Sequence, residues 1–104
     1  YCYTVFGRQK MSVAPDEMIK KLLNSGAGEI LISCIGRDGR FTGLDTDFLS
    51  KIRSQVSSPL IISGGFKSEG DVLEASHLGV DAICISSSMN LPTRIGNVNT
   101  WIRR

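Results

Sequence analysis

Three short apolar runs divide the chain into alternating segments. They cover residues 29–33, 59–63 and 81–86, and each is continuous and bounded by Gly, Pro or Asp. Such runs are typical of strands that are buried on both faces of a parallel sheet. Because about five residues are too few for a buried helix, we expect three strands.

Segments with a helical spacing of apolar residues lie between these runs. Residues 15–24 begin with Pro15 and two acidic residues and are closed by Gly26, which are signals for the two ends of a helix. Residues 45–56, capped by Asp45 or Thr46, and residues 68–78, capped by Ser68, repeat the pattern. The predicted inward-facing side chains of the three helices are Met18, Ile19, Leu22, Leu23, Phe48, Leu49, Ile52, Val56, Val72, Leu73 and Ala75.

The order αβαβαβ predicts parallel strands joined by right-handed crossovers. A further segment, residues 91–104, carries Trp101 and Ile102, which we expect to dock on the body. The chain has 104 residues and opens with neither an initiator Met nor a leader. We therefore expect a piece of a longer protein, in which residues 1–104 form a single, partial domain. An open parallel sheet of apolar strands exposes an edge and a face, which predicts self-association.

Composition narrows the class of protein. The chain is 41% hydrophobic and 21% charged with a net charge of +2, which is ordinary for a globular domain. Its scattered basic residues predict no nucleic-acid partner, and its short apolar runs predict no membrane span. The three cysteines form no CxxC pair and are odd in number, which favours a reducing, cytoplasmic setting. Cys34 and Cys84 lie in apolar runs and are expected to be buried.

Small polar residues follow all three predicted strands. The first strand ends at Ser33 and leads into a long loop, the second ends in Ser63-Gly64-Gly65, and the third ends in a run of serines from Ser86. Parallel strands present their carboxyl ends at one edge, where glycine backbone N–H groups and hydroxyls can hold an anion. Gly64-Gly65 alone could be a simple turn, but three such ends together favour a phosphate site.

Other chemistry is less well supported. Asp38 could be a general acid/base or a carboxylate that orients a ligand, or it could be a turn residue paired with Arg37 or Arg40. Glu29, at the opposite end of its strand, could form a rim salt bridge. His77, the only histidine, is expected to be a solvated or packing residue of a helix rather than a catalytic one. The other basic residues of the predicted helices are expected to be solvated; they are Lys20, Lys21, Lys51 and Arg53. A single His and dispersed Cys offer no metal-ligand spacing, so we expect no metal and no cofactor.

Residues 26–46 read GAGEILISCIGRDGRFTGLDT, and PLIISGG at 59–65 and GVDAICISS at 79–87 follow in order. This series resembles the cyclase subunit family of imidazole glycerol phosphate synthase, over nearly the whole chain. The resemblance implies a (β/α)8 TIM-barrel type fold, of which this chain is a C-terminal half-barrel portion with about three parallel strands and alternating helices. It also implies an enzyme of histidine biosynthesis, which takes ammonia from a glutaminase (glutamine amidotransferase) partner. That ammonia closes a phosphoribulosyl-formimino aminoimidazole carboxamide ribotide to imidazole glycerol phosphate.

The resemblance assigns roles to particular residues. It implies that Ser33 lines the substrate cavity and that Glu29 belongs to the gate through which ammonia enters. The residues that it implies for one substrate phosphate are Asp38, Gly39, Ser63, Gly64, Gly65, Ser86 and Ser87. The two catalytic aspartates of the family lie on strands that are expected upstream, so we expect no catalytic residue in this chain and no activity from it alone.

The chain departs from the family signature at one position. Gly36 stands where the family has the first Asp of its I-D-R-D-G motif. This difference leaves room for a homologous barrel protein of surface-glycan amidation. Two further alternatives are a sister isomerase of histidine biosynthesis, over which Glu29 favours the cyclase, and a non-catalytic phosphate-binding half-barrel.

Overall fold

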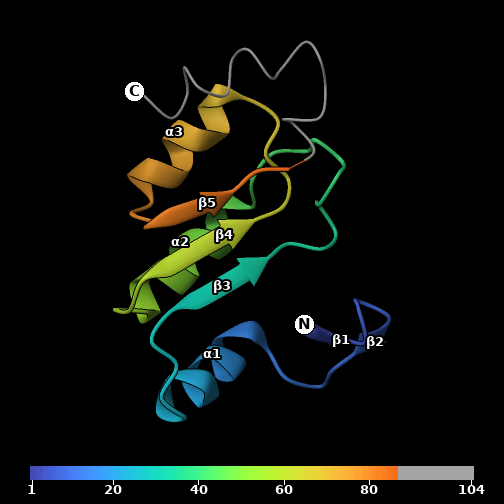
Figure 1. Cartoon of the computed structure of the whole chain (residues 1–104), viewed down its shortest axis with the longest axis vertical. Coiled ribbons are helices and arrows are strands. Elements are labelled where there is room, and N and C mark those ends of the chain that lie inside the picture. Colours follow the sequence, from blue (N-terminus) through green and yellow to red (C-terminus); the bar gives the residue numbers. More distant parts are fainter. Residues whose placement is uncertain (87–104) are drawn as a thin grey trace.

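The central element is a three-stranded parallel sheet. A computed structural model describes residues 1–86, and in it the strands β3 (Ile30–Ser33), β4 (Leu60–Ser63) and β5 (Ala82–Cys84) lie in the order β3-β4-β5 (Figure 1). Ser33 is in register with Ser63, and Ser63 with Cys84. The three predicted strands are confirmed, and their carboxyl ends meet at one edge of the sheet.

The three predicted helices are also confirmed. They are α1 (Pro15–Asn24), α2 (Thr46–Gln55) and α3 (Glu69–His77). Asp45 caps α2, because its carboxylate accepts the Phe48 N–H at 3.3 Å. Ser68 is the N-cap of α3 in a capping box with Asp71. Short-range signals therefore fix where each helix begins.

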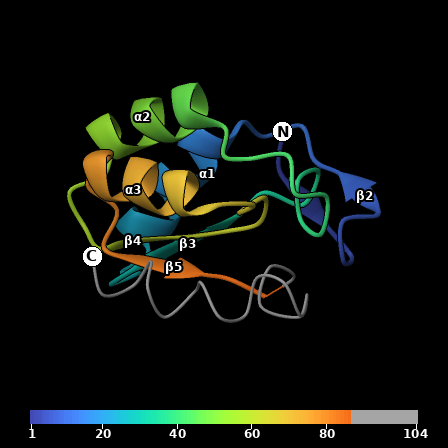
Figure 2. The same ribbon diagram turned by 90° about the horizontal axis from the view of Figure 1, so that it is seen from above.

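The hydrophobic core lies on one side of the sheet. Helices α2 and α3 cover this face, and α1 lies along the β3 edge (Figures 1 and 2). The buried apolar side chains are Ile19, Ile30, Leu49, Ile52, Val56, Leu60, Ile62, Phe66 and Ala75. Burying side chains of this size stabilises the fold by about 1.5–3 kcal/mol each.

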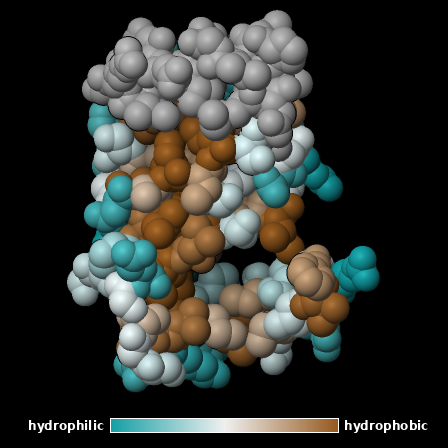
Figure 3. Space-filling view, in the orientation of Figure 1, coloured by the Kyte–Doolittle hydropathy of each residue, from teal (hydrophilic) through white to brown (hydrophobic). Residues whose placement is uncertain are grey.

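The opposite face of the sheet is not covered within residues 1–86. Leu31 on β3 is 58% exposed and Cys84 on β5 is exposed. Apolar side chains run along this face (Figure 3). Burial on both faces, expected from the continuous apolar runs, is therefore wrong for the described residues. The pattern of a run cannot show which elements pack against it.

Four single-residue predictions also fail. Leu22 and Leu73 were expected to face the core and are exposed, and Cys84 was expected to be buried. Arg53 was expected to be solvated, but its side chain is only 20% exposed. Each error comes from a tertiary contact, or the lack of one, that helical or strand periodicity does not encode.

Arg53 joins the amino-terminal ends of two strands. Its guanidinium lies 3.1 Å from the carboxylate of Asp81 and donates to the carbonyl oxygens of Gly79, Val56 and Ser58. The same Asp81 oxygen accepts the Leu60 N–H at 2.9 Å. This backbone hydrogen bond and the arginine lower the pKa of Asp81 from its ordinary value. The contacts fix β4 and β5 at the edge opposite to the serines.

A two-stranded antiparallel hairpin precedes α1. It consists of β1 (Tyr3–Thr4) and β2 (Gln9–Lys10), and Val5, Phe6 and Gly7 at its turn have φ of 51°, 55° and 81°. The sequence analysis did not predict it, because Val and Phe are not residues that favour left-handed turns.

The docking expected for Trp101 and Ile102 concerns residues outside those described. Among residues 1–86, none of the helices has the length and apolar character needed to cross a membrane.

Candidate functional site: a pocket at the strand ends

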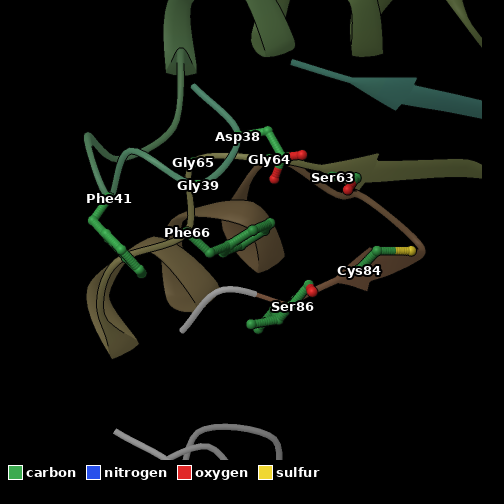
Figure 4. Close-up of a pocket in the computed structure, with 10 residues that line it drawn as sticks. Asp38, Gly39, Phe41, Ser63, Gly64, Gly65, Phe66, Cys84 and Ser86 are labelled. Atoms are coloured by element: carbon green, nitrogen blue, oxygen red, sulfur yellow. The ribbon is translucent and has the colours of Figure 1, made fainter. Parts of the chain in front are cut away.

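A small pocket lies at the carboxyl edge of the sheet, where β4 and β5 end. Its volume is about 70 Å³, and its lining residues are Asp38, Gly39, Phe41, Ser63, Gly64, Gly65, Phe66, Cys84, Ile85 and Ser86 (Figure 4). Six of the seven residues that the sequence analysis assigned to a phosphate site are among them. The seventh, Ser87, lies outside the described residues.

Gly64 and Gly65 allow the β3–α2 loop to approach the pocket closely. Their φ values are 92° and 95°, in the left-handed region that favours glycine. A Cβ at Gly65 would lie 2.6 Å from the Gly43 carbonyl oxygen, and one at Gly64 would lie 2.9 Å from that of Cys34. The two glycines are therefore needed for packing between backbones, whatever the pocket binds.

Backbone hydrogen bonds join the same two loops. The Cys34 N–H donates to the Ser63 carbonyl at 2.9 Å, and the Gly43 N–H donates to the Gly65 carbonyl, also at 2.9 Å. The guanidinium of Arg37 donates to the Gly43 carbonyl at 3.1 Å. The β3–β4 pairing thus continues past the strand ends and joins the two loops that line the pocket.

Left-handed residues alternate with others over residues 39–43 of the β3–α2 loop. Gly39, Phe41 and Gly43 have φ of 70°, 53° and 88°. For a non-glycine residue this conformation costs about 1–2 kcal/mol. Phe41 is half-buried and lines the pocket, so the loop accepts this strain at the pocket itself.

Asp71, in the first turn of α3, holds the loop between β4 and α3. It is 6% exposed and the only buried charged or polar residue among those described. One of its carboxylate oxygens accepts the Lys67 and Ser68 N–H groups at 2.9 and 3.1 Å and the Ser68 hydroxyl at 3.4 Å. These bonds hold the turn between Gly65 and α3 in place. The sequence analysis did not single out Asp71, although its position three residues after Ser68 is the capping-box signal.

The pocket offers neutral donors rather than cations. Hydroxyls of Ser63 and Ser86 and the backbone of three glycines line it together with the carboxylate of Asp38, and none of its ten described lining residues is basic. Asp38 is exposed and takes part in no ion pair found among residues 1–86, and Arg37 bonds to Gly43 instead. Pairing of Asp38 with Arg37 or Arg40 is thus not seen. Such a set of hydroxyls and N–H groups can hold an anion without a compensating side-chain charge.

Ser33 and Glu29 do not belong to this pocket. Ser33 lines a separate hollow of about 580 Å³ between the hairpin, α1 and β3, and Glu29 is exposed at the other end of β3. A rim salt bridge of Glu29 is not found within residues 1–86.

Cys34 lines the same hollow as Ser33. Burial, together with the charge of Asp45, raises the pKa of the Cys34 thiol, although Arg37 acts in the opposite direction. In the described part of the chain, no three His, Cys, Asp or Glu side chains are grouped as a metal site would need. His77 is exposed, as expected.

Parallel strands, alternating helices and a pocket at the carboxyl strand ends define an α/β protein, the class in which ligands bind at this edge of the sheet. Comparison with known sequences gives the family. The family described as "Histidine biosynthesis protein" matches residues 1–91 of this chain, so the chain belongs to it. Members of this family are (β/α)8 barrels, and the sheet and helices seen here are consistent with part of such a barrel.

Individual relatives agree with this assignment. The chain is 36% identical over 90 residues to the imidazole glycerol phosphate synthase subunit HisF of Exiguobacterium sp., covering 86% of this chain and 35% of that protein. It is 35% identical over 98 residues to the subunit of the same name from Streptomyces coelicolor, which covers 93% of this chain and 39% of that protein. It is 41% identical over 64 residues to a putative imidazole glycerol phosphate synthase subunit hisF3 of Vibrio vulnificus, which covers 62% of this chain and 25% of that protein. The chain thus spans about a third of the length of the curated relatives it matches.

Proposed function

We propose that this chain supplies a phosphate-binding portion of a cyclase of the imidazole glycerol phosphate synthase type. The observation that carries the proposal is the pocket in which Asp38, Gly39, Ser63, Gly64, Gly65 and Ser86 meet. Family membership supports a role in histidine biosynthesis. The whole protein would close a phosphoribulosyl-formimino aminoimidazole carboxamide ribotide to imidazole glycerol phosphate, and this portion would hold one of the substrate's two phosphates.

The chemistry of the pocket suits a phosphate monoester. The oxygens of a phosphate accept hydrogen bonds from hydroxyl and N–H groups. The glycine-rich turn after β4 leads directly into the amino-terminal end of α3, where the helix dipole favours negative charge. Ser63 and Ser86 would donate their hydroxyls from neighbouring strand ends. Ser87 would add a further hydroxyl in the same proposal.

The test of this site uses Ser63 rather than Gly65. A substitution at Gly65 would displace Gly43, so lost phosphate binding there could follow from loop damage. Ser63→Asp instead adds a negative charge inside the pocket. We expect at least a tenfold loss of affinity for inorganic phosphate, measured by calorimetry. Ser50→Asp, the same change on the exposed surface of α2, is the matched control. Equal affinity in both variants would refute the site.

Catalysis would need residues outside this chain. The catalytic aspartates of the family are expected upstream, so this chain alone should be inactive. We propose that Ser33 lines the substrate cavity and that Glu29, at the opposite edge of the sheet, lies on the path of ammonia from a glutaminase partner. A protein that also contains the upstream half should turn over substrate with ammonium, and Glu29→Gln in it should impair glutamine-dependent turnover more than ammonium-dependent turnover.

A second candidate is a homologous barrel of surface-glycan amidation, and one observation favours it. Gly36 is exposed, is not among the left-handed glycines, and a Cβ there would meet no atom within 4 Å. The backbone does not require glycine at this position, so the missing carboxylate is a chemical difference. Gly36→Asp in the longer protein should raise cyclase turnover if the chain belongs to the histidine branch. Unchanged turnover would favour the glycan branch.

We further propose that the uncovered sheet face associates with other protein, either the rest of a barrel or a second copy of the chain. Exposed Leu31 and Cys84 on this face support it. Sedimentation velocity of the chain should show species larger than 11.3 kDa, and a monomer at about 100 µM would contradict self-association.

A further inference from the structure

We propose that Phe41 determines specificity at the pocket mouth: its ring packs against the carbon skeleton of an organic phosphate monoester whose phosphate lies in the pocket. This inference rests on the proposed phosphate site and adds to it a residue that contacts the carbon skeleton of the substrate. Phe41 would distinguish an ester from inorganic phosphate, which the polar lining alone cannot do.

The pocket is large enough for the phosphoryl group of such a ligand. Its volume is about 70 Å³, and on this measure one water molecule needs about 10–15 Å³. An ester whose phosphate lies in the pocket directs its carbon skeleton toward the mouth, where side chains of the lining can contact it.

Two aromatic residues line the pocket at different depths. Phe66 is 5% exposed and belongs to the core, whereas Phe41 is half-buried and presents part of its surface outward. Both lie on the side of the pocket away from Ser63 and Cys84 (Figure 4). A ligand that places its phosphate near the serines and glycines would meet Phe41 with its next carbon atoms. Contact between carbon skeletons and aromatic faces is favourable because both leave water.

The backbone at Phe41 does not favour an aromatic residue. Its φ of 53° lies in the left-handed region, which glycine would adopt without strain, as Gly39 and Gly43 do on either side. Strained residues that persist beside a pocket point to a role of the side chain. Packing of Phe41 onto the loop alone would be the competing explanation, and the experiment must separate the two.

Phe41→Gly removes the ring and relieves the strain, so the variant is expected to fold. Phe6→Gly is the matched control, because Phe6 also has a left-handed φ of 55°, is fully exposed and lines neither cavity. Inorganic phosphate and phenyl phosphate are each titrated into the chain and the two variants, with affinity measured by calorimetry. Urea unfolding of all three proteins checks their stability.

Burial of about 50 Å² of apolar surface on Phe41 corresponds to about a five- to tenfold preference for the ester. We expect this preference in the unchanged chain and in Phe6→Gly, and no preference above twofold in Phe41→Gly, with its affinity for inorganic phosphate retained. A preserved preference in Phe41→Gly overturns the inference, and so does an equal loss of affinity for both ligands, which would indicate a structural role. Failure of the unchanged chain to bind either ligand overturns the phosphate site itself.

Discussion

Gly65→Ala tests whether the two loops of the pocket depend on a close backbone contact. The added Cβ would lie 2.6 Å from the carbonyl oxygen of Gly43, and the φ of 95° at this position disfavours alanine. The left-handed conformation costs about 1–2 kcal/mol. Displacement of Gly43 would also break its hydrogen bond to the Gly65 carbonyl, at a cost of about 1 kcal/mol. We therefore expect a loss of about 2–3 kcal/mol in the free energy of unfolding.

Gly26→Ala separates the two contributions. Gly26 has a φ of 98°, close to that of Gly65, but a Cβ there would meet nothing within 4 Å. This variant should lose only the conformational cost of about 1–2 kcal/mol. Urea unfolding followed by far-ultraviolet circular dichroism measures both; with a slope of about 1 kcal/mol per M, the two midpoints should differ by about 1 M. If Gly65→Ala is no more destabilised than Gly26→Ala, the reasoning about the loop contact is wrong.

Three further predictions concern titratable groups. The folded-state pKa of Asp81 is lowered, chiefly by the Leu60 N–H. The contribution of Asp81 to stability is therefore present above about pH 4 and is lost as the pH falls through the lowered value. The difference in urea midpoint between the chain and Asp81→Asn should shrink from pH 6 to pH 2.5, and a constant difference would contradict this linkage. Asp71→Ala should cost about 1–3 kcal/mol of unfolding free energy, because two half-buried backbone N–H groups lose their acceptor; an unchanged urea midpoint would count against that role. Burial raises the thiol pKa of Cys34, whereas Cys84 is exposed in the single chain. Iodoacetamide at pH 8, applied at a concentration at which sedimentation shows a monomer, should therefore modify Cys84 faster, as peptide mass spectrometry can measure; the reverse order would disagree with the structure.

The order and bounds of the main elements could be predicted because their signals are local. Pro15, Asp45 and Ser68 mark helix starts within one residue of those observed. The grouping of Ser63, Ser86 and the glycines at one pocket also follows from sequence, because parallel strands place their carboxyl ends together.

Contacts between distant segments could not be predicted in the same way. Arg53 and Asp81 are 28 residues apart, and nothing in the helical pattern of α2 distinguishes Arg53 from its solvated neighbours. The exposure of Leu31 depends on what packs against the sheet rather than on its own strand. The hairpin turn at Val5 and Phe6 lacks the residues that mark such turns.

The hydrogen bond from the Gly43 N–H to the Gly65 carbonyl makes one amide a reporter of the pocket. Exchange of this amide with solvent deuterium requires that the bond opens, and opening it separates the two loops that line the pocket. The exchange rate of Gly43 therefore measures how often the pocket loses its shape while the sheet stays intact. A ligand that binds only the closed pocket would slow exchange at Gly43 while leaving the amides of the distant hairpin unaffected.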